Sequence, residues 1–187
     1  MAAIQKPFAQ INAFAMQNGV VLGIWALLAQ CAMVGSFTCG ILSMVNFMMM
    51  LFTPIILFLL TKKFRRAVAP TGVFTITQGF LHTLLTTIYA STWVAIGVYI
   101  YLLYVDNGYL FDEYVAYFNR PEVAELLSQK EVQQELAVVL QGLTLEEVIN
   151  GLRSVPPATY SMMVFYGNLM VSPLLSLVIA IFLRRTK

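Results

Sequence analysis

The acidic side chains are the first candidates for chemistry in this sequence, and all nine lie between residues 105 and 157. Two carboxylates facing each other across a cleft can act as general acid and base when one pKa is shifted. Here the acids are spread along helical segments, and several fall at predicted helix starts, where negative charge is stabilising anyway. We therefore expect a solvated acidic face without catalytic or metal-binding residues: Asp106, Asp112, Glu113, Glu122, Glu125, Glu131, Glu135, Glu146 and Glu147.

One histidine and two cysteines are the remaining reactive groups. His82 is the only histidine and could shuttle protons, but no acid lies in any apolar run to partner it. We expect a structural or interfacial role for it near the start of its helix. Cys31 and Cys39 match no metal-ligand spacing, and a disulfide between them would need a tight turn. The sequence thus predicts no catalytic residue, no metal ligand and no cofactor.

The composition is that of a membrane protein. Of the 187 residues, 59% are hydrophobic and only 11% are charged, whereas a soluble domain carries about 25% charged residues. Four apolar runs predict transmembrane helices, at about 19–37, 41–60, 76–104 and 160–183. No basic face stands beside a soluble fold, so we expect no nucleic-acid partner. The predicted fold is all-α, with four transmembrane helices and a small acidic helical insertion between spans three and four.

The sequence divides into three predicted parts. Residues 1–104 hold an N-terminal amphipathic segment and spans one to three, residues 105–157 the acidic insertion, and residues 158–187 span four and a basic tail. The first 18 residues form either a short helix in the membrane interface, with Ile4 on its apolar face, or the start of span one. A signal peptide with Lys6 as its basic region is the rival interpretation, which the length of the apolar run disfavours.

Short motifs predict where helices begin and how they pack. Gly19-x3-Gly23 has the small-residue spacing that lets two membrane helices approach closely. Pro121 suits a first helical position, and a turn at residues 106–108 precedes a short helix at about 112–119. Three motifs have capping-box spacing and predict further helix starts: Thr75-x-x-Gln78, Ser128-x-x-Glu131 and Thr144-x-x-Glu147.

Basic residues predict the orientation in the membrane. Eight of the eleven basic residues lie in segments that face the cytoplasm when both termini are inside. We therefore expect a multi-pass protein of the bacterial inner membrane, with both termini cytoplasmic and the acidic insertion outside. The cluster after span two also provides candidate contacts to anionic lipid head groups, at about 1 kcal/mol per residue: Lys62, Lys63, Arg65 and Arg66.

Four motifs carry a resemblance to a known family: Asn18-Gly19-x3-Gly23, Thr77-Gln78-Gly79-Phe80, Tyr104-Val105-Asp106 and Leu174-x-Ser176-Leu177-Val178-Ile179-Ala180. Together they resemble a four-span bacterial integral membrane family of unknown function that is common in Bacteroidetes. The resemblance covers most of the chain, which departs from the pattern in having few charges near Gln78. It implies no catalytic residues, and it suggests a membrane glycosyltransferase as a partner.

The predicted function is that of a non-enzymatic accessory or scaffolding subunit of a membrane complex. Its expected partners are membrane lipid and another membrane protein or a second copy of the chain. The alternative is a small carrier or channel for an unidentified solute, whose path would pass polar residues of span three. The candidate intramembrane polar positions are Asn46, His82 and Asn168. An enzyme acting on lipid would need a nucleophile or paired acids near the interface, and we find none in the sequence.

Overall fold

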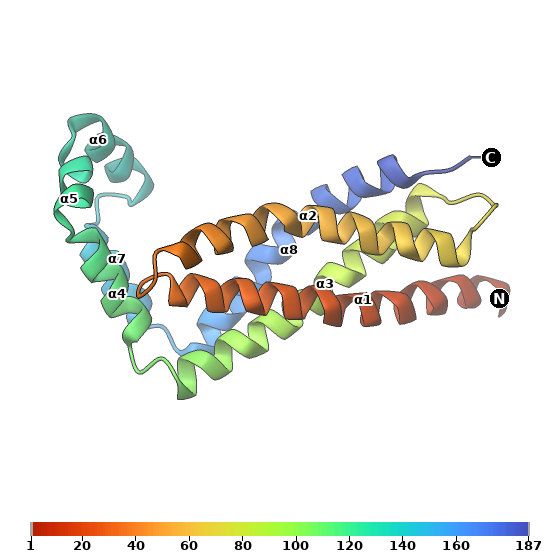
Figure 1. Cartoon of the computed structure of the whole chain (residues 1–187), viewed down its shortest axis with the longest axis horizontal. Helices are drawn as coiled ribbons and strands as arrows, with labels where there is room; N and C mark the ends of the chain where they lie inside the picture. The colour runs from red at the N-terminus through yellow and green to blue at the C-terminus, as the bar shows by residue number, and fades with distance from the viewer. Residues whose placement is uncertain (1, 187) are drawn as a thin grey trace. The chain divides into compact units, whose positions relative to one another are not determined.

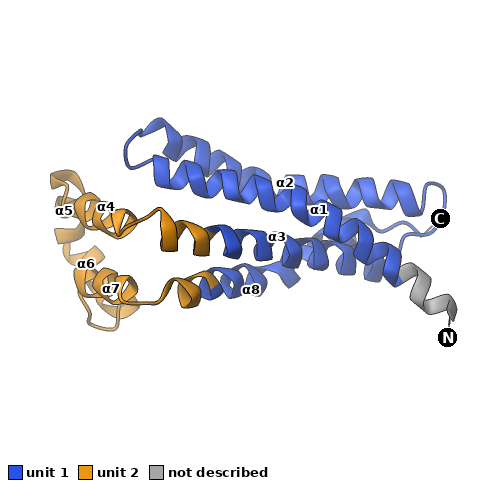
Figure 2. Cartoon of the chain, turned by 90° about the horizontal axis from the view of Figure 1, so that it is seen from below, with its two compact units in different colours: residues 1–97, 162–187 blue, residues 98–161 orange. Residues whose placement is uncertain are grey.

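The computed structural model describes the backbone of residues 2–186 and the side chains of residues 8–186. This part of the chain is all-α, as predicted, with eight helices and no strand. Residues 1–97 and 162–187 form one compact unit, and residues 98–161 form a second (Figure 2). In chain order the helices are α1 (Ala2–Gly35), α2 (Ile41–Val68), α3 (Ile76–Tyr104), α4 (Tyr109–Phe118), α5 (Pro121–Ser128), α6 (Lys130–Val139), α7 (Leu145–Arg153) and α8 (Pro157–Leu183) (Figure 1).

Four helices are long and apolar enough to cross a membrane, which marks the chain as a multi-pass membrane protein. Two of the expected spans were too short. The candidate span in α1 extends back at least to Phe8, and α2 continues through the basic cluster to Val68. Helix α1 is continuous from Ala2 onward, which agrees with the alternative in which the first 18 residues begin span one instead of forming a separate amphipathic segment. The side chains of Ile4 and Lys6, on which that segment and the signal-peptide interpretation rested, lie outside the described residues.

Helices α1 and α2 are joined by a short turn at residues 36–40 and are tied together inside the apolar region. The Trp25 indole Nε1 donates to the Met49 carbonyl at 3.2 Å and to the Thr53 hydroxyl at 3.2 Å. The Asn46 amide of α2 donates to the Ala29 carbonyl of α1 at 2.8 Å. Asn46, one of the candidate intramembrane polar positions, therefore hydrogen-bonds a neighbouring helix.

Helices α1 and α3 approach each other through the two glycines of α1. A Cβ atom added at Gly19 would overlap Cβ of Tyr89 on α3, and one added at Gly23 would lie 2.9 Å from Cβ of Trp93. The later residue of α1 contacts the later residue of α3, so the two helices run parallel. The first and third crossings of a membrane must have this relative direction. The predicted close packing of Gly19-x3-Gly23 is confirmed, with α3 as its partner.

The end of the first unit that holds the α2–α3 connection is closed by main-chain contacts. Phe74 and Arg185 form an isolated antiparallel bridge, with N–H···O distances of 2.9 and 3.0 Å. Arg65 Nη1 donates to the Leu183 carbonyl at 3.1 Å and so stabilises the C-terminal end of α8. Of the proposed head-group contacts, Arg65 thus has a protein partner, while Lys63 and Arg66 are exposed.

Helix starts in the second unit test the capping predictions. Pro121 is the first residue of α5, as predicted. Thr144 and Glu147 form the predicted capping box at α7. Hydrogen bonds from the Thr144 backbone N–H and then from its hydroxyl hold the pKa of Glu147 below its ordinary value. The capping box at Ser128 was wrong: its hydroxyl donates to the Glu125 carbonyl and closes α5, so α6 begins without a side-chain cap.

The first prediction concerns the α1–α3 contact. Gly19→Ala should lower the stability of the purified protein by about 1–3 kcal/mol, because the added methyl group overlaps Tyr89 and forces the helices apart. Gly151→Ala in α7 is the matched control, since a Cβ there meets no atom within 4 Å. Thermal unfolding in detergent measures both variants. Equal unfolding temperatures for the two variants would contradict the close packing.

Candidate functional site

The first unit contains a buried polar cluster formed by three helices. Asn18 of α1 lies with its amide nitrogen 3.0 Å from His82 Nε2 on α3. His82 Nδ1 lies 3.2 Å from the Thr61 hydroxyl of α2, which is 3.0 Å from the Thr83 hydroxyl of α3. His82, Thr61 and Thr83 are completely buried and Asn18 is 8% exposed. We call these four residues the His82 cluster.

The identity of the Asn18 atom sets the direction of the two hydrogen bonds to the His82 ring. An amide nitrogen can only donate, so His82 Nε2 accepts from Asn18 and the imidazole hydrogen is on Nδ1. Nδ1 then donates to the Thr61 hydroxyl. The Thr61 hydroxyl can donate a hydrogen bond to the Leu57 carbonyl at 2.9 Å or to the Thr83 hydroxyl. Each side chain therefore has a partner, as burial among apolar helices requires.

Aromatic rings hold the imidazole in place. The Phe64 ring stacks on the His82 ring with centroids 4.2 Å apart and planes 4° from parallel. Phe14 and Phe74 pack against Phe64 at centroid distances of 5.4 and 5.9 Å. Phe64 is 1% exposed and Phe74 is completely buried. The ring of His82 is thereby fixed both by hydrogen bonds at its edge and by packing on its face.

Further polar side chains lie near the His82 cluster, namely threonines of α3 and serines of α8. Thr86 and Thr87 donate to carbonyls one turn earlier in α3, as hydroxyls in apolar helices commonly do. Ser172 and Ser176 are buried on α8, and their hydroxyls have no hydrogen-bond partner among the described residues. Gly79 of α3 contacts Ala180 of α8. Because the two helices run antiparallel (Figure 1), the two serines lie at the level of the α3 threonines.

The three predicted intramembrane positions have different environments. His82 is buried in the cluster and bonded to two other helices, which agrees with a structural role. Asn46 binds α1 and belongs to a separate contact. Asn168 is exposed on α8. The sequence did not identify Asn18 and Thr61 as partners of His82. The position of Asn18, directly before the close-packing motif at Gly19, was a signal that it faces another helix.

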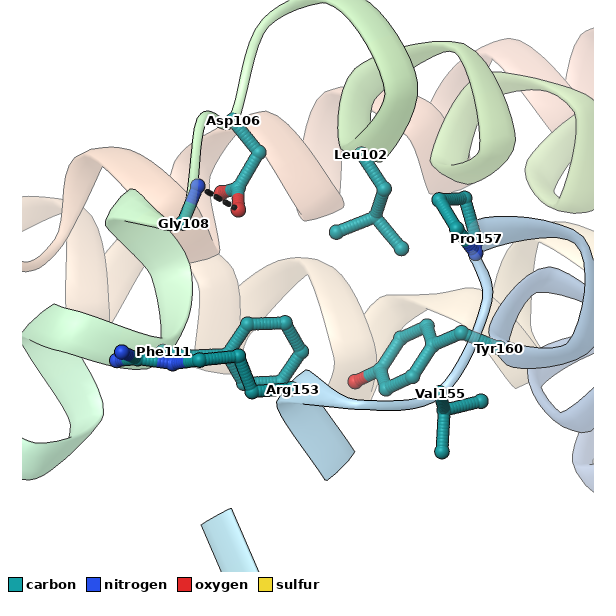
Figure 3. Close-up of a pocket in the computed structure, with 8 residues that line it drawn as sticks. All are labelled: Leu102, Asp106, Gly108, Phe111, Arg153, Val155, Pro157 and Tyr160. Atoms are coloured by element: carbon teal, nitrogen blue, oxygen red, sulfur yellow. Dashed lines mark hydrogen bonds between the residues drawn. The ribbon is translucent and has the colours of Figure 1, made fainter. Parts of the chain in front are cut away.

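The second unit contains a pocket of about 240 Å³, shown in Figure 3. Asp106 is 4% exposed, and its carboxylate accepts backbone N–H groups of Gly108 at 3.0 Å and Leu110 at 2.9 Å, which caps the start of α4. Its carboxylate points toward the pocket (Figure 3). Most of the other lining residues are apolar or aromatic. They lie near the ends of α3, α4, α7 and α8 and in the α7–α8 connection: Leu102, Phe111, Arg153, Val155, Pro157 and Tyr160.

Charges near this pocket are largely paired within the unit. The Arg153 guanidinium forms an ion pair with Asp112, which joins α7 to α4. Both partners are substantially exposed, so this pair contributes little stability. The Phe111 and Tyr160 rings meet edge to face at 6.0 Å. Burial, followed by the neighbouring Tyr160, raises the pKa of Tyr114. These contacts describe a packed junction whose polar lining comes from the buried Asp106 carboxylate, Arg153 and Tyr160.

The acidic side chains are not gathered into a cation site. Among residues 8–186, no three side chains of histidine, cysteine, aspartate or glutamate lie close enough together to hold a metal ion. Cys31 and Cys39 are free and exposed. The most specific arrangement of polar side chains in the described chain is therefore the His82 cluster, which can hold three helices in one geometry.

Comparison with known proteins gives one match. The family described as "Protein of unknown function (DUF4199)" matches residues 13–185. No curated protein and no solved structure matches the chain. The matched range includes most of α1, the whole of α2, α3 and α8, and the whole second unit.

The second prediction tests the His82 cluster. His82→Leu keeps the side-chain volume but leaves the buried Asn18 amide nitrogen without its partner and removes the donor to Thr61, so stability should fall by about 1–3 kcal/mol. Thr92→Val on the exposed side of α3 is the matched control, since the Thr92 hydroxyl bonds only its own helix. Thermal unfolding in detergent compares the two. A His82→Leu variant as stable as the control would show that the cluster does not hold the helices together.

Proposed function

The chain belongs to the DUF4199 family, and we propose that it is a non-enzymatic accessory or scaffolding subunit of a membrane complex. The observation that carries the proposal is the His82 cluster. Its side chains are buried, bonded to one another and drawn from α1, α2 and α3. Such an arrangement fixes helices relative to each other, and a scaffold needs a fixed framework to present its surfaces.

The orientation we propose is an inner-membrane protein with both termini in the cytoplasm. Its support is the distribution of basic residues in the first unit. Lys62, Lys63, Arg65 and Arg66 lie at the end where the Phe74–Arg185 bridge joins the C-terminal tail to the α2–α3 connection. A positive end of this kind faces the cytoplasm by the positive-inside rule. The parallel course of α1 and α3 agrees with a four-crossing arrangement.

The surfaces available to a partner are broad and apolar. The N-terminal half of helix α2 exposes several methionine and phenylalanine side chains, including Met44, Phe47 and Met50. Methionine is unbranched and flexible, and it adapts to the shape of different partners. Lipid covers such a face in the absence of a partner. We therefore expect the partner to be a membrane protein that contacts the chain within the bilayer.

The third prediction tests this function. Purification of the intact chain from native membranes in mild detergent should yield a stoichiometric partner protein or a homo-oligomer. A variant with Met44→Ala, Phe47→Ala and Met50→Ala should recover less of a heterologous partner, while Lys63→Ala serves as the control outside the apolar face. Quantitative mass spectrometry and light scattering measure both. Recovery of a clean monomer at native expression level would contradict the accessory role.

A small carrier or channel is the second candidate, and one observation favours it. The Ser172 and Ser176 hydroxyls are buried without a partner beside a proline, Pro173, that interrupts the hydrogen bonding of α8. Polar groups of this kind line solute paths in membrane transporters. Vesicles reconstituted with the chain would then show solute flux that falls in Ser172→Ala and Ser176→Ala variants. Flux unchanged in both variants would remove this support.

A further inference from the structure

An exposed amide near the middle of an apolar helix marks a surface of α8 that needs a partner. Asn168 is exposed and makes no hydrogen bond to the described part of the chain. Its helix is one of the four that can cross a membrane. An unpaired amide in hydrocarbon is unfavourable because lipid tails neither donate nor accept hydrogen bonds. The surface around Asn168 is therefore incomplete in the single chain.

The residues around Asn168 follow the spacing of a helix–helix zipper. Val164, Asn168, Val171, Leu175 and Val178 alternate steps of four and three residues, which places them in one stripe along α8. We call this stripe the α8 seam. Val171 is 63% exposed and Val178 is 50% exposed, and Val164 and Leu175 are half-buried.

The α8 seam differs from the face of α8 that packs in the first unit. The packed face contains Ser172, Ser176, Ala180 and Leu183, which are at most 2% exposed. Leu175 of the seam also contacts the core of the first unit, while Asn168, Val171 and Val178 lie exposed beside the packed face, so a second helix could bind there without displacing the core. A Cβ added at Gly167, next to the seam, meets no atom within 4 Å. The backbone at Gly167 is therefore open to close approach of another helix.

A second copy of the same chain is the occupant that fits this seam. Two copies inserted with the same orientation are related by a two-fold axis along the membrane normal, so their α8 helices run parallel at equal depth. Asn168 of one copy then lies opposite Asn168 of the other. The amide carries both a donor and an acceptor and can pair with itself. A single asparagine within a seam of β-branched and leucine side chains favours a defined pairing register.

We propose that the chain forms a parallel homodimer through the α8 seam, with the two Asn168 amides hydrogen-bonded to each other. The proposal rests on the proposed scaffolding function and names its first partner, because a dimer presents two copies of every other surface. An unrelated membrane helix would need a polar group at the same depth to satisfy Asn168. The second copy supplies that group by symmetry.

The fourth prediction is a cross-linking experiment on the full-length chain in native membranes. Cys31 and Cys39 are free and exposed, so both are first replaced by serine. Val171→Cys and Val178→Cys should each give a disulfide-linked dimer on mild oxidation. Met170→Cys is the matched control, because Met170 is 81% exposed but points away from the seam. Cross-linking at position 170 equal to that at position 171 would overturn the proposed seam.

The role of Asn168 is tested in the same background. Asn168→Leu should lower the dimer association constant roughly threefold to tenfold, as expected for loss of an interhelical hydrogen bond in a membrane. Asn168→Gln should retain most of the association, since it keeps the amide. An unchanged association constant for Asn168→Leu would overturn the amide pairing. Copurification of a different stoichiometric partner without any cross-link at position 171 would refute the homodimer and leave the scaffolding function standing.

Discussion

The arrangement of the first unit depends on one constraint, which is that polar groups inside the hydrocarbon must find partners within the protein. Lipid tails are as apolar as leucine, so apolar faces alone give little reason for helices to associate in a membrane. In this chain the association comes from two local features. Gly19 and Gly23 let α1 and α3 approach closely, and the His82 cluster joins both helices to α2. Together they explain why a histidine is buried in an apolar bundle without any acid beside it.

The second unit is stabilised by different interactions from those of the first. Its short helices are amphipathic and exposed on most sides, and their ends are set by local hydrogen bonds. Asp106 caps α4, and Thr144 with Glu147 caps α7. Ile149, Leu110 and Phe111 supply a small buried core. This division explains the composition of the chain, since most of the acids are exposed to water, Asp106 is buried but bonded to backbone N–H groups, and intramembrane polar groups are neutral.

Local features of the sequence predicted most of the fold, because composition and capping act over a few residues. The four apolar helices, the turn before α4 and the caps at Thr75 and Thr144 needed no knowledge of tertiary structure. Helix ends were less predictable: α2 continues through Lys62–Arg66 because lysine and arginine are good helix formers and favour a C-terminal end. Ser128 has the capping-box spacing, but its hydroxyl donates to the Glu125 carbonyl at the end of α5 and so does not cap α6.

The candidate site was less predictable because it depends on contacts distant in sequence. His82 could be identified as unusual, but Asn18 lies 64 residues away from it. Composition also could not tell which intramembrane amides are bonded within the chain. Asn46 is bonded to α1, while Asn168 is exposed and unpaired, and both are single amides in apolar runs.

Nitrogen NMR of the chain labelled with ¹⁵N-histidine tests the central claim most directly, because His82 is the only histidine and gives a single ring system. If the His82 cluster holds α1, α2 and α3 together, the hydrogen is on Nδ1, Nε2 accepts from Asn18, and the Nδ1 hydrogen exchanges slowly with water. A hydrogen on Nε2, or rapid exchange of the ring hydrogen with solvent, would contradict the account.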